Sequence, residues 1–205
     1  MKKGFSLPLW VAGAARSALK KLVGLPCHYY ELIKIPKEKK EVKIEIHSVG
    51  LLQDDSHALG ISFAKSGLDL DITQNLEIWT IVFLEKISSD NPVKTNPINL
   101  IAGSGVGIKE NTSEICISDF AKEVLSENLL DIIPKGFNLK LEIIFPNGKF
   151  LAERTSNKSF GIVEGLSIIG TSAETYSSAS PEQLEIAKTE LAKLIKNDYE
   201  GEVVS

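Results

Sequence analysis

Two aspartates and a threonine stand close together in residues 67–73, which have the sequence Gly-Leu-Asp-Leu-Asp-Ile-Thr. Asp69 and Asp71 are two positions apart, so in an extended segment both carboxylates would point to the same side. Such a pair can accept hydrogen bonds from ribose hydroxyls or from an amino group. Turns also use aspartate for local hydrogen bonds, so a structural role of Asp69, Asp71 and Thr73 stays open.

A second segment that could bind a ligand is the glycine-rich run at residues 103–107, Gly-Ser-Gly-Val-Gly. Its backbone N–H groups could form a cradle for a carboxylate or a phosphate. The alternative is a tight turn after a buried strand. Neither the lysine of a phosphate-binding P-loop nor the complete dinucleotide fingerprint accompanies the run, so the segment by itself does not decide between the two.

The apolar, strand-like run at residues 160–172 is interrupted by Gly161, Gly165 and Gly170. Repeated glycine in such a run indicates bulges or a close approach of the backbone to another group. Ser180, followed by a proline, then predicts the start of a helix. A strand, a small-residue loop and a capped helix would together offer backbone N–H groups to an anion.

The histidines and cysteines do not indicate a metal site. Cys27 and Cys116 are far apart, and the three histidines His28, His47 and His57 lack the spacing of a ligand set. We therefore expect no protein-bound metal, and we expect both thiols to be reduced.

Composition favours a globular protein that does not bind nucleic acid. With 205 residues, 43% of them hydrophobic and 24% charged, the chain can bury a full core. The net charge of −4 argues against a nucleic-acid partner, since phosphate backbones require a basic face. Charged residues interrupt the apolar segment 7–25, which predicts a buried helix rather than a membrane anchor or signal peptide. We expect a cytoplasmic protein.

Hydrophobic periodicity predicts the elements that would position these segments. Helices are expected over residues 9–23, 118–130 with Ser118 as N-cap, and 181–196. Strands are expected over 30–35, 42–49, 59–64, 76–87, 98–102 and 139–145.

The pair Asn147-Gly148 predicts a hairpin turn after the last of these strands, with residues 150–153 as the return strand. Alternating strands without regular βαβ alternation predict an α+β fold with a mixed, largely antiparallel sheet. We expect residues 1–178 to form this main domain. Residues 179–205 would be a helix and the beginning of a second, truncated α/β domain.

Four segments, in order along the chain, together resemble the cobalt-precorrin-5B C1-methyltransferases of anaerobic cobalamin biosynthesis. Residues 67–73 are similar to a family segment that runs roughly Gly-Asp-Asp-Pro-Asp-Val-Thr, and residues 103–107 to its Gly-Glu-Gly-Val-Gly turn. Residues 155–171 carry Thr-Ser-Asn, Gly-Ile-Val and Ser-Ile-Ile-Gly-Thr. The fourth segment is residues 4–12, and the resemblance covers nearly the whole chain.

The chain departs from the family pattern most at its N-terminus. Most relatives have a Gly-Tyr-Thr-Thr-Gly-Thr-type segment there, whereas this chain keeps Gly4, Phe5 and Ser6 but continues Leu-Pro-Leu-Trp. Hydroxyl donors to an anionic ligand are therefore mostly missing, although amides at the helix N-terminus could still serve. Leu68 and Leu70 are further departures, as is Glu164, which stands where a second glycine is usual.

The resemblance implies an enzyme that transfers a methyl group from S-adenosyl-L-methionine to ring carbon C-1 of cobalt-precorrin-5B, giving cobalt-precorrin-6A. The substrate would be a cobalt-containing tetrapyrrole, and any cobalt would arrive with it. No general base stands out in the sequence, and a homo-oligomer stays open. The binding candidates for substrate or methyl donor are Ser6, Asp69, Asp71, Thr73, Gly103, Gly105, Gly107, Thr155, Asn157, Gly161, Ser167, Gly170 and Thr171.

We expect these candidates to converge on one concave surface. Two alternatives remain beside the enzyme. The family continues past Ser205, so this chain could be a non-catalytic corrinoid-binding or scaffold fragment; an unrelated enzyme that binds phosphate at its glycine loops ranks below both.

Overall fold

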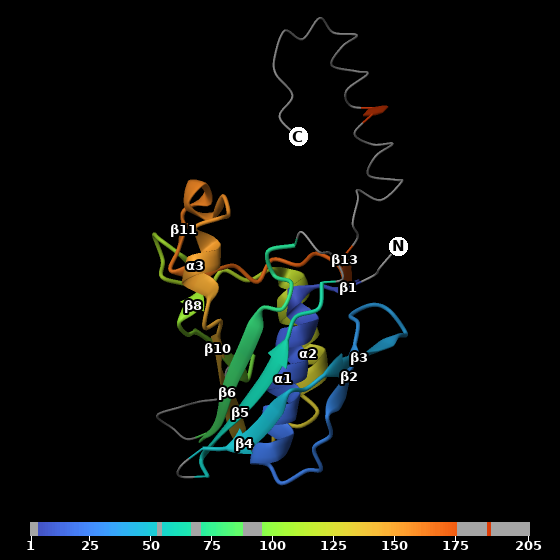
Figure 1. The fold of residues 1–205 in the computed structure, drawn as a ribbon. Helices are drawn as coiled ribbons and strands as arrows, with labels where there is room; N and C mark the ends of the chain where they lie inside the picture. The colour runs from blue at the N-terminus through green and yellow to red at the C-terminus, as the bar shows by residue number, and fades with distance from the viewer. Residues whose placement is uncertain (1–3, 53–54, 67–70, 88–95, 176–187, 190–205) are drawn as a thin grey trace, which may run out of the picture.

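Five strands form the main sheet, in the order β4-β5-β6-β10-β7 (Figure 1). They are β4 (Ser48–Leu51), β5 (His57–Phe63), β6 (Glu77–Lys86), β10 (Phe137–Ile144) and β7 (Ile98–Ala102). The first four pair antiparallel, and only β7 runs parallel to its neighbour β10. The computed structural model describes residues 4–52, 55–66, 71–87, 96–175 and 188–189.

Two helices cover one face of this sheet, α1 (Leu7–Leu22) and α2 (Asp119–Leu129). Helix α1 can lie close to the sheet because a Cβ atom on Gly60 of β5 would stand only 2.2 Å from the Ala14 carbonyl oxygen. The hairpin of β2 (Tyr30–Lys34) and β3 (Glu41–Glu45) covers the other side of the helix. Residues Leu9, Val11 and Leu19 are consequently without solvent exposure, which makes α1 the centre of the core.

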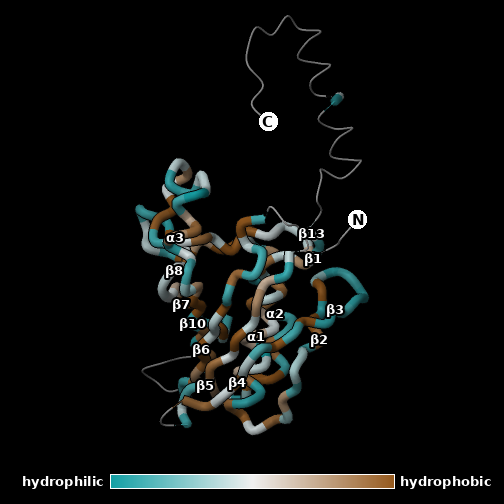
Figure 2. Tube along the Cα trace, in the orientation of Figure 1, coloured by the Kyte–Doolittle hydropathy of each residue, from teal (hydrophilic) through white to brown (hydrophobic). Residues whose placement is uncertain are grey.

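Short elements gather beyond one end of the sheet (Figure 1). β8 (Gly105–Val106) pairs in parallel with β12 (Gly165–Leu166), and β9 (Ile108–Lys109) pairs antiparallel with β11 (Ile162–Val163). The helix α3 (Gly148–Ala152) and the 3₁₀ turn η1 (Asn157–Phe160) lie beside them, and β1 (Gly4–Phe5) pairs with β13 (Glu174–Thr175). Figure 2 shows the apolar stretches on α1 and the sheet, and polar stretches at the tip of the β2–β3 hairpin.

The fold is α+β with a largely antiparallel sheet, so the predicted class is confirmed. The predicted helices over 9–23 and 118–130 correspond to α1 and α2, and Ser118 Oγ accepts a hydrogen bond from Ala121 N at 3.1 Å. Helix α2 buries one apolar stripe, as its periodicity predicts, whereas α1 is buried on almost every side of its first three turns, between the sheet and the hairpin.

Three local predictions are wrong. No return strand forms at 150–153, where residues 150–152 belong to α3 and Glu153 follows it, because β10 already pairs with β6 on one side and β7 on the other. The predicted strand 42–49 is divided between β3 and β4, which belong to different sheets. The run 160–172 is not one strand but contains β11, β12 and a single bridge from Ile168 to Ile117.

The predicted helix at 181–196 and the domain boundary at 178/179 lie outside the described residues, except for helical residues 188–189. Within the described part of the chain, no helix combines the length and the apolar character needed to span a membrane.

Candidate functional site

Three glycines from different parts of the chain pack backbone against backbone at the end of the sheet. A Cβ atom on Gly165 would lie 1.9 Å from the Gly105 carbonyl oxygen, and one on Gly148 would lie 2.1 Å from the same oxygen. A Cβ atom on Gly105 would in turn lie 2.0 Å from the Phe145 carbonyl oxygen. Contacts this short exclude any side chain at these three positions, so β8, β12 and the start of α3 approach one another closely only because each has a glycine there.

The other predicted glycines also serve the packing. Gly103 and Gly107 leave room for the side chains of Ile144 and Ile162, and Gly170 leaves room for Pro8 at the beginning of α1. Gly161 ends η1 with a φ of +66°. The glycine segments thus form a rigid support, and the proposed cradle for an anion is not needed to explain them.

The predicted polar side chains are largely bonded within their own turns. Asp71 Oδ1 accepts hydrogen bonds from both Thr73 N and Thr73 Oγ1, each at 2.8 Å. Thr155 Oγ1 donates to Ala152 O at 2.7 Å, and Asn157 Nδ2 donates to Gly165 O at 3.1 Å. Asp71, Thr73, Thr155 and Asn157 therefore hold the local fold, and Asp69 lies outside the described residues.

The beginning of α1 offers few amides to an anion. Pro8 in the first turn has no N–H group, and Leu9 N already donates to Ser6 O at 3.1 Å. Ser6 Oγ is buried without a hydrogen-bond partner. The idea that helix amides replace the missing hydroxyls of the N-terminal segment is thus not supported for α1.

The predicted segments lie at one end of the molecule, in two groups (Figure 1). Residues 167–171 connect the two groups. Residues 103–107 meet residues 155–165 at β8 and β12, and Asn157 and Gly165 line a cavity of about 200 Å³ there. The turn at Asp71 lies nearer to β1 and β13, where Thr175 Oγ1 donates to Ser66 O at 2.6 Å. Between the groups, Ser167 is buried and Thr171 exposed, and Ser118 Oγ donates to Gly170 O at 2.6 Å.

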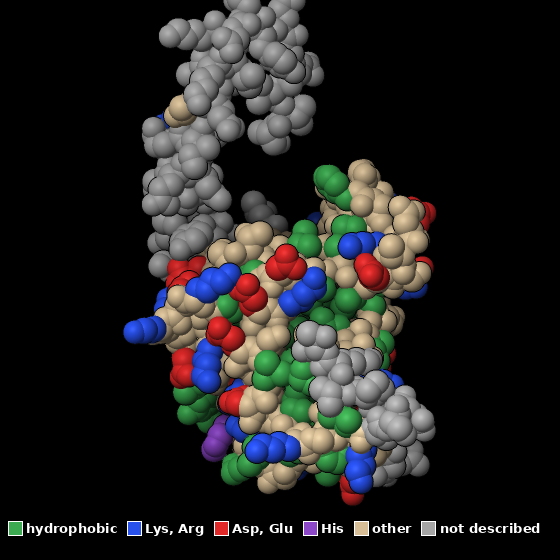
Figure 3. Space-filling view, turned by 180° about the vertical axis from the view of Figure 1, so that it is seen from behind, with side chains coloured by type: hydrophobic (Ala, Val, Ile, Leu, Met, Phe, Trp, Pro, Cys, Tyr) green, Lys and Arg blue, Asp and Glu red, His purple; other side chains and the backbone are tan. Residues whose placement is uncertain are grey.

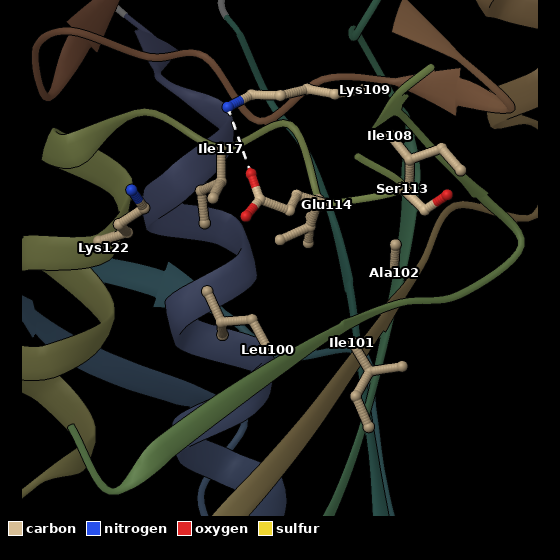
Figure 4. Close-up of a pocket in the computed structure, with 10 residues that line it drawn as sticks. Leu100, Ile101, Ala102, Ile108, Lys109, Ser113, Glu114, Ile117 and Lys122 are labelled. Carbon is tan, nitrogen blue, oxygen red and sulfur yellow. Dashed lines mark ion pairs between the residues drawn. The ribbon is translucent and has the colours of Figure 1, made fainter. Parts of the chain in front are cut away.

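A larger cavity of about 600 Å³ lies next to the glycine turn, between β7, β9 and α2 (Figure 4). We call it the β7 cavity. Its apolar lining consists of Leu100, Ile101, Ala102, Ile108, Ile115 and Ile117, and its polar lining of Lys109, Ser113, Glu114 and Lys122. Figure 3 shows hydrophobic side chains gathered on this side of the molecule, with charged side chains around them.

The predicted residues do not line the β7 cavity, but they connect its walls. The glycine turn 103–107 joins Ala102 of β7 to Ile108 of β9. Cys116 N donates to Gly107 O at 2.8 Å, and Ile168 N donates to Cys116 O at 2.9 Å. Sequence reasoning found this framework and missed the lining; the alternation of Ile115 and Ile117 just before the α2 cap was the available signal.

The charged groups of the β7 cavity are at its rim. Lys109 Nζ and Glu114 Oε2 are 3.5 Å apart, with 57% and 66% of their side chains exposed. Lys122 Nζ lies 3.1 Å from Asp119 Oδ1, one turn earlier on α2. Exposed pairs of this kind contribute little to stability, so both lysines can exchange partners at small cost.

The thiols and histidines do not form a metal centre within the described residues, since no three His, Cys, Asp or Glu side chains gather there. Cys116 is buried, and burial raises the pKa of the Cys27 thiol. The Cys27 thiol is therefore protonated at neutral pH, which makes it a poor nucleophile.

The sequence model of the CbiD family matches residues 1–177. The chain belongs to the CbiD family. It is 86% identical over 204 residues to a cobalt-precorrin-5B C(1)-methyltransferase of Prochlorococcus marinus strain MIT 9312, and 70% identical over 199 residues to that of strain MIT 9515. These matches cover 100% and 97% of this chain but 55% and 54% of the relatives, so the chain spans about half their length.

The fold of this CbiD-family chain is similar to the crystal structure of the cobalamin biosynthesis protein CbiD from Archaeoglobus fulgidus, with a TM-score of 0.63. The likeness covers 93% of this chain and 59% of that chain at 21% identity, and it shows the shared fold.

Proposed function

We propose that the complete gene product containing this chain is a cobalt-precorrin-5B C1-methyltransferase. The observation that carries the proposal is the 86% identity over 204 residues to a protein of that name. The reaction would move a methyl group from S-adenosyl-L-methionine to ring carbon C-1 of the cobalt-bound corrinoid precursor. We place this reaction in the cytoplasm, where the thiols would stay reduced.

The chemistry asks the protein mainly for alignment. The methyl group on a sulfonium is already activated, so attack by a nucleophilic ring carbon needs close approach, correct angle and exclusion of water. Holding reactants in such a geometry can lower a barrier by roughly 7–11 kcal/mol. A rigid support such as the glycine packing of Gly105, Gly148 and Gly165 suits this demand.

The described candidates do not by themselves form a site for the methyl donor. Asp71 Oδ1 is bonded to Thr73, and the Thr155 and Asn157 side chains are bonded to the backbone. These groups are committed to the fold, so we assign no residue to S-adenosyl-L-methionine. Sequence that the longer relatives have in addition is a natural source of donor contacts.

The test is methylation of cobalt-precorrin-5B by the complete gene product, with deuterated-methyl S-adenosyl-L-methionine and mass spectrometry of the corrinoid. We expect one labelled methyl group per substrate. The 205-residue chain alone should be much slower, since a site that lacks one wall loses alignment and admits water. Absence of methylation by the complete product would reject the proposal.

The span of about half the relatives' length also favours a second candidate, a corrinoid-binding part without turnover of its own. Equal turnover by the 205-residue chain and the complete product would exclude this candidate. Corrinoid binding by the 205-residue chain without turnover would support it.

A further inference from the structure

We propose that the β7 cavity binds the tetrapyrrole, with the apolar lining against one face of the macrocycle and Lys109 and Lys122 on its side-chain carboxylates. This inference rests on the proposed function for the identity of the ligand. It adds a binding site for that ligand whose lining contains none of the binding candidates predicted from the sequence.

Size and lining favour the β7 cavity over the other described cavities. Its volume of about 600 Å³ compares with about 450 Å³ beside His47 and Phe63, about 310 Å³ beside Arg16, and about 200 Å³ beside Asn157. Six of its ten lining residues are aliphatic. A flat macrocycle needs such a wall, and the open shape lets the rest of the ring extend beyond the cavity.

Charge also favours this location. The lining carries Lys109 and Lys122 against Glu114 alone, whereas the whole chain has a net charge of −4. Figure 4 shows the two lysines approaching from opposite sides of Ile117, so that their ammonium groups stand apart above an apolar floor. That separation suits carboxylates on different arms of one ring, because each ammonium can meet its own arm.

The carboxylate of Glu114 repels an anionic ligand, but its exposed position keeps this repulsion small. The Lys109–Glu114 pair is more than half exposed on both sides, so an incoming carboxylate can take the place of Glu114 while Glu114 turns to solvent. Lys122 can likewise leave Asp119, whose side chain is 94% exposed.

The backbone of β7 adds hydrogen-bond donors to the same place. Leu139 N donates to Pro97 O and Gly103 N donates to Ile143 O. The backbone N–H and C=O groups of the odd-numbered residues of β7 therefore point toward β10. The N–H groups of Leu100 and Ala102 then point to the opposite edge, along which the cavity runs. Among the described strands, β7 is the end of the sheet.

The glycine turn gives this cavity its fixed shape. Residues 103–107 connect β7 to β9, and the close packing of Gly105 against Gly165 and Gly148 holds this connecting turn in place. The residues that resemble the family would thus act on the ligand indirectly, by positioning the walls.

The experiment measures binding of dicyanocobyrinic acid, a corrinoid heptacarboxylate, and of its heptamethyl ester, whose side chains are uncharged, to the complete gene product by calorimetry. In the double variant Lys109→Gln, Lys122→Gln, we expect the Kd of the acid to rise about tenfold, as two exposed charge pairs allow. The Kd of the ester should not change. The matched control is Lys135→Gln, a change of an exposed lysine that does not line the cavity, which should alter neither.

A second variant tests the apolar wall. Ala102→Phe fills part of the cavity and should weaken the acid and the ester alike, and thermal unfolding shows whether the variant is folded. Should Ala102→Phe not fold, the lysine variants decide alone, since their side chains are half exposed.

The outcomes separate this inference from the proposed function. If the complete product methylates cobalt-precorrin-5B and the double lysine variant keeps the wild-type KM for the corrinoid, the β7 cavity is the wrong location and the function stands. If the acid binds with the expected dependence on the lysines but methylation is absent, the location stands and the reaction is rejected.

Discussion

Glu164 combines an unfavourable backbone with a favourable side-chain contact. Its φ of +70° lies in the left-handed region, which residues with a Cβ atom rarely adopt. Its carboxylate is exposed and pairs with Lys149, and the hydrogen bond from Lys149 lowers the pKa of Glu164 below its ordinary value of 4.5. The backbone cost should dominate, because exposed ion pairs contribute little.

We therefore expect Glu164→Gly to raise the Tm by about 2–4 °C at neutral pH. A lowered carboxyl pKa stabilises the fold above the unfolded pKa, and this contribution is lost as the pH falls through the folded value. The advantage of the glycine variant should accordingly be larger at pH 3 than at pH 7. Thermal unfolding at both values measures it, and Glu164→Ala, which loses the pair but keeps a Cβ atom, should show no gain.

Gly165 is a position where a single added methyl group should strongly destabilise the fold. A Cβ atom there would stand 1.9 Å from a backbone oxygen of Gly105, which no flexible side chain can relieve. We expect Gly165→Ala to lower the free energy of unfolding by about 3 kcal/mol. Gly50→Ala is the control, since nothing lies within 4 Å of its added Cβ; equal unfolding midpoints in urea for the two variants would contradict the packing account.

At single positions, the sequence showed which residues matter more clearly than why they matter. Glycine where a strand should continue indicated close backbone approach, and Gly165 confirms it. Asp71 and Thr73 were open between ligand and turn, and their mutual hydrogen bonds are those of a turn. The alternation of Ile115 and Ile117 was the one available signal for the lining of the β7 cavity, and it does not separate cavity residues from core residues, because Leu100 and Ile117 look like any core residue until the fold leaves them facing a cavity.

Helices and strands were predictable where local periodicity agreed with the final packing. α1 and α2 lie where their periodicity predicts them, whereas the Asn147-Gly148 turn leads into α3 because both edges of β10 are occupied. Whether an edge of a strand is free depends on the order of the strands in the sheet. β10 lies between β6 and β7, which begin at Glu77 and Ile98, far from β10 in the sequence. No local pattern contains that information.

The side chain of Asn128 connects α2 to β2 by hydrogen bonds. Its Oδ1 accepts from Lys34 N at 2.8 Å, and its Nδ2 donates to Lys34 O at 2.9 Å and to Val124 O at 2.8 Å. The side chain is fully buried, so removing it would leave the Lys34 peptide groups of β2 without their partner at α2.

We expect Asn128→Leu to lower the free energy of unfolding by about 2–4 kcal/mol, because buried backbone groups lose their hydrogen bonds. Hydrogen exchange at the Lys34 amide should speed up in parallel. Glu127→Ala, an exposed change on the same helix, should stay within about 0.5 kcal/mol of wild type. Unchanged protection of the Lys34 amide in Asn128→Leu would argue against this bond as the link.

At the scale of the whole molecule, the buried carboxylate of Glu31 links the β2–β3 hairpin to α1 and, through Arg16, to α2. It lies on β2 with 4% of its side chain exposed, 2.8 Å from Lys20 Nζ and 3.5 Å from Arg16 Nε, both on α1. Arg16 Nη1 also donates to Asn128 O at the end of α2. Glu31 thus pairs with two cations of α1, and Arg16 pairs in addition with Asp131 Oδ1 at 3.1 Å, so these charges link the hairpin, α1 and the end of α2.

Removing this carboxylate should therefore cost far more than removing an exposed one. Glu31→Gln removes the buried carboxylate between Arg16 and Lys20, whose side chains are less than a fifth exposed, and leaves Arg16 paired with the half-exposed Asp131, so we expect a loss of about 3 kcal/mol in unfolding free energy. The Lys37–Glu123 pair also joins the hairpin region to α2, but its side chains are 80% and 43% exposed. Glu123→Gln should lower the free energy of unfolding by less than about 0.5 kcal/mol. If urea unfolding shows a similar loss in both variants, burial does not explain the contribution of Glu31 to stability.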